Sequence, residues 1–239
     1  MSAASRDPWH RRLAGGLPPA VRRRVLRFEA DIERQVEFLA RALPDRARVL
    51  DAGAGEGKHA SYFVRCRYVG VDLAVGEAAW DYSRLDAVAD LARLPFADAT
   101  FDAALNIVVL EHLPEPWRAL EEIGRVLGPG SPLLVAAPQE WGVHQAPHDY
   151  FRYTRHGLQR LLEQAGFCQI AIEPAGGFFV LLGRRLLDAV LYFQGGLRWL
   201  LFPLVAVFAG AAGLLLPSLD FLDSKKDSTL GYLCRARKR

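Results

Sequence analysis

The chain has 239 residues, of which 51% are hydrophobic, and this is enough to bury one sizeable core. Its formal net charge of +3 is too small to indicate nucleic acid as a partner. The three cysteines are scattered and odd in number, which argues against a disulfide framework and against a paired-cysteine metal site. The first residues lack the apolar core of a secretory signal, so we expect the protein in the cytoplasm.

The N-terminal region contains one amphipathic segment. Between residues 21 and 43, apolar side chains recur at helical spacing among arginine and glutamate, and Pro44 ends the pattern. The apolar positions are Val25, Phe28, Ile32, Val36 and Leu39. We therefore predict that residues 1–44 form an N-terminal helical extension.

From Arg48 onward, short apolar runs alternate with stretches of helical spacing. The predicted strands cover residues 49–53, 68–73, 86–91, 101–110, 131–138, 168–173 and 229–236, and the predicted helices cover residues 58–65, 116–127 and 155–165. Alternation of this kind is typical of a parallel sheet covered on both faces. We predict an α/β fold: a doubly wound, mostly parallel seven-stranded sheet with helices on both faces, built from residues 45–177 and 228–239.

Residues 178–227 contain the most hydrophobic part of the chain. The apolar run is broken by Gly195 and Gly196, and residues 199–219 approach the roughly 20 apolar residues that span a bilayer. A single crossing would leave the last strand on the wrong side of the membrane. We therefore predict an apolar helical hairpin inserted before the last strand, which dips into a bilayer or packs on a partner. The alternative is an extra buried helix pair.

A glycine-rich turn follows the first predicted strand. Glycines alternate at positions 53, 55 and 57, where a ligand can approach the main chain or where the backbone takes torsions that other residues avoid. Lys58 stands where a dinucleotide fingerprint needs its last glycine, which disfavours NAD and FAD. Asp72 ends the next strand, near the position where an acidic side chain accepts ribose hydroxyls. Together these features predict a ligand that carries adenosine.

From about residue 48 to residue 167, the chain resembles the class I S-adenosylmethionine-dependent methyltransferases, in particular the broad branch that acts on small molecules and lipids. The resemblance rests on the glycine turn, on Asp72, on the Asp90 segment and on the stretch from Asn106 to Leu113. It implies S-adenosylmethionine as cofactor, with Asp90 at the adenine amino group. The implied cofactor-binding residues are Asp51, Gly53, Gly55, Gly57, Asp72, Leu73, Asp90, Leu91 and Asn106.

Methyl transfer is an in-line displacement, and aligning the two reactants supplies much of the rate enhancement. A hydroxyl acceptor also needs a general base, for which histidine is the usual choice. Our candidate catalytic residues are His112, His148 and Tyr150, with a helix-capping role for His112 as the alternative. Arg152 and Tyr153 are predicted to bind the acceptor in a lid after the fifth strand, although they could simply pack the loop.

We expect no metal site. His144, His148 and Asp149 have a spacing that could suit a metal ion, but no cluster of cysteine or glutamate accompanies them in the sequence.

The predicted function is methyl transfer to a small or lipophilic acceptor, such as a quinone, a lipid or a lipid-linked glycan. The enzyme would lie at the cytoplasmic face of a membrane, peripheral or monotopic, without nucleic acid as partner. Two alternatives stay open: a catalytically silent scaffold that binds the cofactor and is anchored at a membrane, and an oxidoreductase with a nucleotide cofactor.

Overall fold

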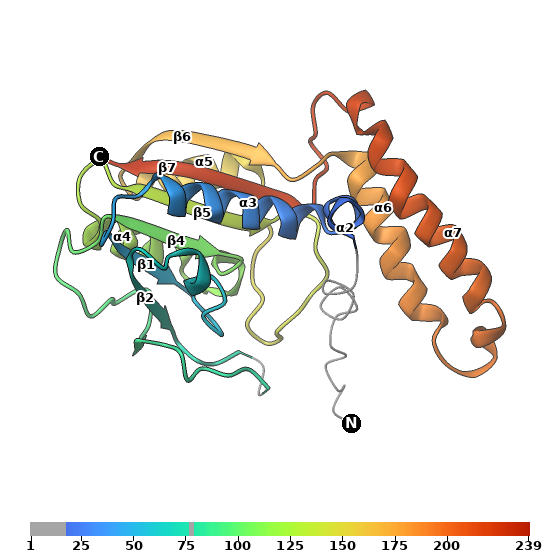
Figure 1. Ribbon diagram of the computed structural model, residues 1–239, viewed down its shortest axis with the longest axis horizontal. Helices are drawn as coiled ribbons and strands as arrows, with labels where there is room; N and C mark the ends of the chain where they lie inside the picture. The colour runs from blue at the N-terminus through green and yellow to red at the C-terminus, as the bar shows by residue number, and fades with distance from the viewer. Residues whose placement is uncertain (1–17, 77–78) are drawn as a thin grey trace. The chain divides into compact units, whose positions relative to one another are not determined.

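The computed structural model describes residues 18–76 and 79–239, which divide into two compact units. Residues 18–31 and Ala175–Leu230 form the unit that contains the apolar segment. Ile32–Pro174 and Gly231–Arg239 form the sheet unit. Figure 1 shows the elements of both units.

The sheet unit is built on seven strands in the order β3-β2-β1-β4-β5-β7-β6. The strands are β1 (Arg48–Ala52), β2 (Arg67–Asp72), β3 (Ala87–Val88), β4 (Ala103–Ile107), β5 (Pro132–Pro138), β6 (Phe167–Pro174) and β7 (Gly231–Lys238). Strands β1 to β5 pair in parallel, and β7 lies antiparallel between β5 and β6. The predicted seven-stranded, mostly parallel sheet is therefore confirmed.

Helices cover both faces of this sheet. In Figure 1, α4 (Pro116–Val126) and α5 (Arg155–Gln164) lie behind the sheet, and α3 (Arg27–Ala42) passes in front of it. Strands β4 and β5 are apolar and almost wholly buried, as expected for strands covered on both sides. The core gathers their side chains with those of α4 and α5, including Leu120, Ile123, Leu158 and Leu162.

Three predicted elements differ from the structure. Residues 58–65 form turns and a short 3-10 helix, η1 (Ala60–Tyr62), because only His59 and Phe63 are buried there and no apolar stripe holds a longer helix to the sheet. The strand predicted at residues 86–91 shortens to β3 at the sheet edge. The N-terminal helix is interrupted at Leu26, between α2 (Pro19–Val25) and α3.

The other unit contains the predicted apolar hairpin. Helix α6 (Phe178–Ala189) packs against α7 (Phe202–Leu215), with the Gly183 and Gly213 backbones close together. The 3-10 turns η3 (Val190–Phe193) and η4 (Gly196–Leu200) connect them, and η5 (Leu216–Leu222) follows α7. Gly195 and Gly196 both have positive φ, so the chain reverses at the predicted break.

Polar contacts fasten the ends of the hairpin. The Asp220 carboxylate accepts a hydrogen bond from the Gly177 amide at 3.0 Å, and the Asp223 carboxylate accepts from the Phe178 amide at 2.8 Å. Arg184 is buried and forms an ion pair with Glu29 at 3.2 Å. The Asp220 and Asp223 contacts join the start of α6 to η5 and to the residue after it, so the hairpin enters and leaves at one place.

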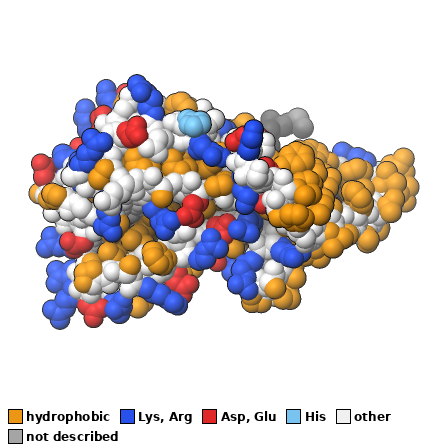
Figure 2. Space-filling view, turned by 90° about the horizontal axis from the view of Figure 1, so that it is seen from above, with side chains coloured by type: hydrophobic (Ala, Val, Ile, Leu, Met, Phe, Trp, Pro, Cys, Tyr) orange, Lys and Arg blue, Asp and Glu red, His pale blue; other side chains and the backbone are white. Residues whose placement is uncertain are grey.

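The surface of the hairpin is apolar. Phe202–Leu222 has a mean hydropathy of 2.0 with 11% of it buried, and by length and composition it is the one helical segment within residues 18–76 and 79–239 that could cross a membrane. Leu204, Val207 and Phe208 are 70%, 73% and 64% exposed. Figure 2 shows hydrophobic side chains gathered over the hairpin, toward the right of the view.

Candidate active site

The glycine-rich loop leaves β1 at the carboxyl edge of the sheet. Gly53, Gly55 and Gly57 have φ values of +91°, +54° and +67°, which L side chains adopt only with strain. A Cβ atom at Gly53 would lie 2.3 Å from a methyl carbon of Val109, so the loop and the segment after β4 are in direct contact. Of the two reasons for glycine that the sequence suggested, the torsion holds at Gly53, whereas the close neighbour there is the Val109 side chain.

Asp51 is fully buried beneath this loop. One carboxylate oxygen accepts a hydrogen bond from the Tyr68 hydroxyl at 2.6 Å and lies 3.2 Å from His59 Nδ1. Burial and the Asp51 charge raise the pKa of the Tyr68 hydroxyl, so Tyr68 stays a hydrogen-bond donor. The other oxygen of Asp51 is buried with no hydrogen-bond partner within the part of the chain that the structure describes.

Asp72 ends β2 and holds the loop from the neighbouring strand. Its carboxylate accepts hydrogen bonds from the Gly55 amide at 2.9 Å and from the Ala74 amide at 2.8 Å. Leu73, directly after it, is 49% exposed. The acidic side chain predicted to bind ribose therefore lies against the glycine loop, as that role requires.

The remaining cofactor candidates lie at the ends of β3 and β4. Asp90 is exposed beside a small cavity of about 60 Å³ that Leu113 also lines, and Leu91 is buried. Asn106 is fully buried and donates to the Ala52 carbonyl at 2.8 Å. Its side-chain oxygen has no hydrogen-bond partner in the described ranges. The carboxyl ends of four neighbouring strands thus carry all nine predicted cofactor residues.

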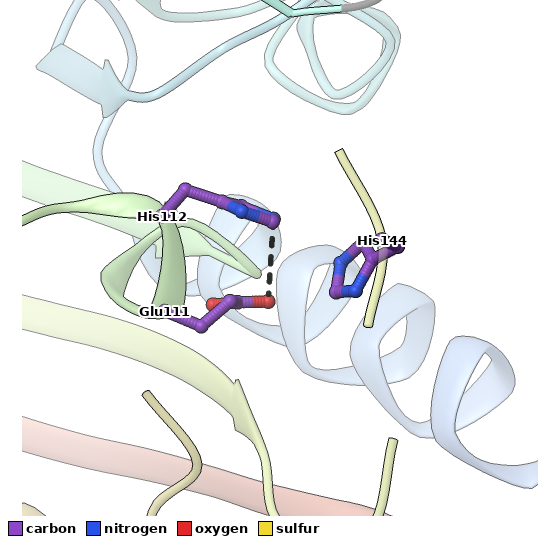
Figure 3. A group of neighbouring side chains, drawn as sticks. All are labelled: Glu111, His112 and His144. Atoms are coloured by element: carbon purple, nitrogen blue, oxygen red, sulfur yellow. Dashed lines mark ion pairs between the residues drawn. The ribbon is translucent and has the colours of Figure 1, made fainter. Parts of the chain in front are cut away.

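Beyond β4, the chain makes a sharp turn. Val108 has φ +58°, an unusual torsion for a β-branched residue, and the 3-10 turn η2 (Leu110–His112) follows. The turn places Glu111 and His112 side by side, with His112 Nε2 and Glu111 Oε1 3.7 Å apart. Figure 3 shows both side chains with His144, whose ring meets the His112 ring edge to face at a centroid distance of 4.7 Å.

Glu111 is the site residue that the sequence analysis missed. Its side chain is fully buried, and neither carboxylate oxygen has a hydrogen-bond partner among the described residues. Burial raises the pKa of this carboxyl to about 8. Burial also lowers the pKa of His112, which is held by a 2.6 Å contact between its Nδ1 and the His148 carbonyl. A glutamate adjacent to a candidate histidine was the signal available in the sequence.

The segment between β5 and α5 forms the predicted lid. Arg152 fastens it by pairing with Asp149 at 2.6 Å and by donating to the Trp141 and Gly142 carbonyls. Although burial raises the pKa of Asp149, hydrogen bonds from Arg152 and from the His144 amide outweigh it and lower the pKa to about 2. The ion pair therefore persists at neutral pH.

The structure separates the other lid residues by exposure. Tyr150 is 45% exposed, and its hydroxyl lies 3.0 Å from Nδ1 of the exposed His148. Tyr150 and Arg152 both line a cavity of about 220 Å³. Tyr153 is buried and donates to the Leu110 carbonyl at 2.8 Å, so it joins the lid to η2. Catalytic roles for His112, His148 and Tyr150, and acceptor binding by Arg152 and Tyr153, stay predictions.

Part of the sheet unit is similar to a known protein family. Residues 50–135 match the family described as "Methyltransferase domain". A Mycolicibacterium smegmatis protein described as "Probable S-adenosylmethionine-dependent methyltransferase" is 36% identical over 154 residues, which cover 59% of this chain. An "Uncharacterized methyltransferase" of Mycolicibacterium gilvum is 35% identical over 149 residues, or 54% of this chain. The chain spans 58% of the length of each of these two relatives.

Solved structures share the fold. The [4+2]-cyclase SpnF aligns with a TM-score of 0.54 and 26% identity, covering 86% of this chain and 80% of that one. A Haemonchus contortus phosphoethanolamine N-methyltransferase 2 aligns with a TM-score of 0.53 and 17% identity, covering 86% of this chain and 52% of that one. The motif residues, the strand order and the family match therefore agree on a methyltransferase domain at residues 50–135.

Proposed function

We propose that this chain is an S-adenosylmethionine-dependent methyltransferase that acts at a membrane on a small or lipophilic acceptor, such as a quinone, a lipid or a lipid-linked glycan. The observation that carries the lipophilic part of the proposal is the apolar surface of α7, where Leu204, Val207 and Phe208 face solvent. An exposed apolar patch of this kind is typical of a surface that meets lipid or a partner. Cytoplasmic location at the membrane face is part of the same proposal.

The residues at the sheet edge fit the cofactor. The glycine loop carries no side chains of its own at positions 53, 55 and 57, which suits an adenosine lying close to the main chain. Asp72 and Asp90 supply carboxylates for ribose hydroxyls and for the adenine amino group. The unpartnered buried oxygens of Asp51 and Asn106 are acceptors suited to the ammonium group of the cofactor's methionine part. The bound cofactor supplies an electrophilic methyl group, and the protein aligns the acceptor with it.

The two alternative functions receive less support. Lys58 occupies the place of the third glycine of a dinucleotide fingerprint, and two relatives carry the name methyltransferase, which disfavours an oxidoreductase. A silent scaffold would have no need for a buried, unpartnered carboxylate beside two histidines on the acceptor side of the glycine loop.

Calorimetric titration of the purified full chain with S-adenosylmethionine and, separately, with NADH tests the cofactor. We expect binding of the sulfonium compound alone. Incubation of the protein with isotopically methyl-labelled cofactor and a lipid extract, followed by extraction into organic solvent, then tests turnover. Label in the organic phase supports a lipophilic acceptor. Cofactor binding without any label transfer would favour the scaffold.

Vesicle flotation tests the membrane part of the proposal. We expect the wild-type chain to float with phospholipid vesicles and the triple variant Leu204→Gln, Val207→Gln, Phe208→Gln to remain in the soluble fraction, since the hydrophobic contribution scales with buried apolar area. Val64→Gln and Val143→Gln form the control pair, because these valines are 83% and 82% exposed but belong to the sheet unit. Equal flotation of the triple variant and the wild type would remove the hairpin from the proposal.

A further inference from the structure

Two loops at neighbouring strand ends bring three potential ligands together. Glu111 and His112 follow β4, and His144 lies in the loop after β5. Because β4 and β5 pair in parallel, their carboxyl ends meet at the same edge of the sheet. One donor atom from each of the three residues lies within 4.8 Å of the others. In Figure 3, the three side chains converge on one space between the two loops.

Two of these three potential ligands have atoms without hydrogen-bond partners. Both oxygens of the fully buried Glu111 and the Nε2 atom of His112 form no hydrogen bond within residues 18–76 and 79–239. The 3.7 Å between Glu111 Oε1 and His112 Nε2 is too long for a hydrogen bond. A buried carboxyl group and a buried ring nitrogen without partners are costly in a folded protein, and one metal cation would satisfy both.

The Nδ1 atoms of both histidines are already held. His112 Nδ1 lies 2.6 Å from the His148 carbonyl, which fixes that nitrogen as the donor and leaves the lone pair on Nε2. His144 Nδ1 lies 3.1 Å from the Gly142 carbonyl and 3.4 Å from the Asp149 carboxylate. Metal-binding histidines are oriented in this way by a carbonyl or carboxylate at the other ring nitrogen. Arg152 forms an ion pair with Asp149, so the contacts that orient His144 continue into the lid.

We propose that Glu111, His112 and His144 bind one divalent transition-metal ion. Two imidazole nitrogens and one carboxylate suit ions such as Zn²⁺, Mn²⁺, Fe²⁺ and Co²⁺. Binding needs a contraction of the cluster, since each ligand atom must come to about 2.0–2.2 Å from the ion. The partly exposed His144 lies on a loop and is the ligand that can move. Three protein ligands leave a position open for an oxygen of a third molecule.

The proposed ion could activate the methyl acceptor, and this inference rests on the proposed methyl transfer. A hydroxyl oxygen in the open position would lose its proton to solvent more readily, because a bound divalent ion lowers the pKa of its oxygen ligand. That oxygen would then bond to the methyl carbon while the methyl–sulfur bond of the cofactor breaks and the demethylated thioether leaves. The acceptor class indicated is therefore a phenol, enol or alcohol rather than an amine. The segment that carries the ligands contacts the glycine loop through Val109 and Gly53, which keeps the two halves of the site adjacent.

Metal binding is tested without cofactor or acceptor. The purified full chain, stripped with a chelator and dialysed, is titrated with Zn²⁺ by calorimetry and with Co²⁺ by visible absorption. We expect one ion per chain and a Co²⁺ spectrum typical of nitrogen and oxygen ligands. His144→Ala and Glu111→Gln should each weaken binding more than about 100-fold, and Asp149→Asn should weaken it by about 10- to 100-fold.

Two controls exclude unspecific metal binding and misfolding of the variants. His156→Ala removes an exposed histidine of α5 outside the cluster and should leave the affinity unchanged. Circular dichroism of each variant checks the fold, and His144→Ala is the decisive variant because its side chain is 26% exposed. Absence of binding by the wild type, or equal binding by wild type and His144→Ala, would overturn the proposal. The same preparations are also titrated with S-adenosylmethionine, so that the two proposals can be told apart. Absence of cofactor binding would contradict the proposed function, whereas absence of metal binding would contradict only the metal site.

Discussion

The carboxyl edge of the sheet has two halves that use different parts of the polypeptide. At the ends of β1 and β2, the main chain forms the site: three glycines with positive φ make the turn, and the Asp72 carboxylate holds it by accepting from the Gly55 amide. At the ends of β4 and β5, side chains form the site: Glu111, His112 and His144 lie close together. The Glu111 carboxylate oxygens and His112 Nε2 have no hydrogen-bond partner among the described residues. A site built from main chain suits a ligand that is the same in every member of a family, such as a cofactor. A site built from side chains suits an acceptor that differs from one enzyme to another.

The largest expected effect comes from the main-chain half. Gly53→Ala adds a Cβ atom 2.3 Å from Val109 and forces an L residue to φ +91°. Torsional strain and overpacking together should lower the free energy of unfolding by about 2–5 kcal/mol and abolish cofactor binding. Chemical denaturation and calorimetry measure the two effects.

Gly130→Ala serves as the control for that substitution. Gly130 has φ +76° but nothing within 4 Å of its would-be Cβ, so only the torsional part, about 1–2 kcal/mol, should remain. Equal destabilisation by the two variants would show that contact with the segment after β4 is unimportant.

The second-largest effect is expected from removing the Asp72 charge at the end of β2. Asp72→Asn should weaken S-adenosylmethionine binding by about 10- to 100-fold, since hydrogen bonds to a charged group contribute about 1.5–3 kcal/mol. Asp102→Asn is a matched control, because Asp102 also accepts a backbone amide, that of Arg48, but does so away from the loop. If both variants bind the cofactor alike, Asp72 only supports the loop.

In the side-chain half, Arg152→Leu tests the lid. The variant removes the pair with Asp149 and the hydrogen bonds to the Trp141 and Gly142 carbonyls, so we expect a loss of about 1–3 kcal/mol in stability. Limited proteolysis should cut faster between residues 139 and 153. Arg160→Leu, a change of the same type at an exposed position of α5, should leave that cleavage rate unchanged. An unaltered lid in Arg152→Leu would contradict its fastening role.

The smallest effect is expected beneath the glycine loop. Tyr68→Phe removes the 2.6 Å hydrogen bond to Asp51 and leaves that carboxylate with His59 alone. A loss of about 1 kcal/mol is expected, with nearly normal cofactor affinity, because the other Asp51 oxygen is untouched. A large drop in affinity would instead mean that Tyr68 fixes the position of Asp51 for the ligand. Urea unfolding and calorimetry distinguish the two outcomes.

Most of the fold could be predicted from the sequence. Buried parallel strands are short continuous apolar runs, and their helices show helical spacing, so the sheet was predicted strand by strand. The failures have local causes. Residues 58–65 follow three positive-φ glycines and bury only His59 and Phe63, so they remain turns, and β3 at the edge of the sheet keeps a single neighbour.

By itself, the sequence determined the glycine turn after β1, on which the proposed cofactor half of the site rests. Glycines at alternate positions after an apolar strand indicate positive φ angles that few other residues adopt. Because these torsions depend on neighbouring residues in the chain, the turn can be predicted from the sequence. Only the tertiary structure decided the other half. Glu111 and His144 lie on separate loops, and they meet because β4 and β5 are parallel neighbours. Burial and the loss of hydrogen-bond partners arise from packing, so no spacing in the sequence could reveal that Glu111 is a buried carboxylate facing two imidazoles.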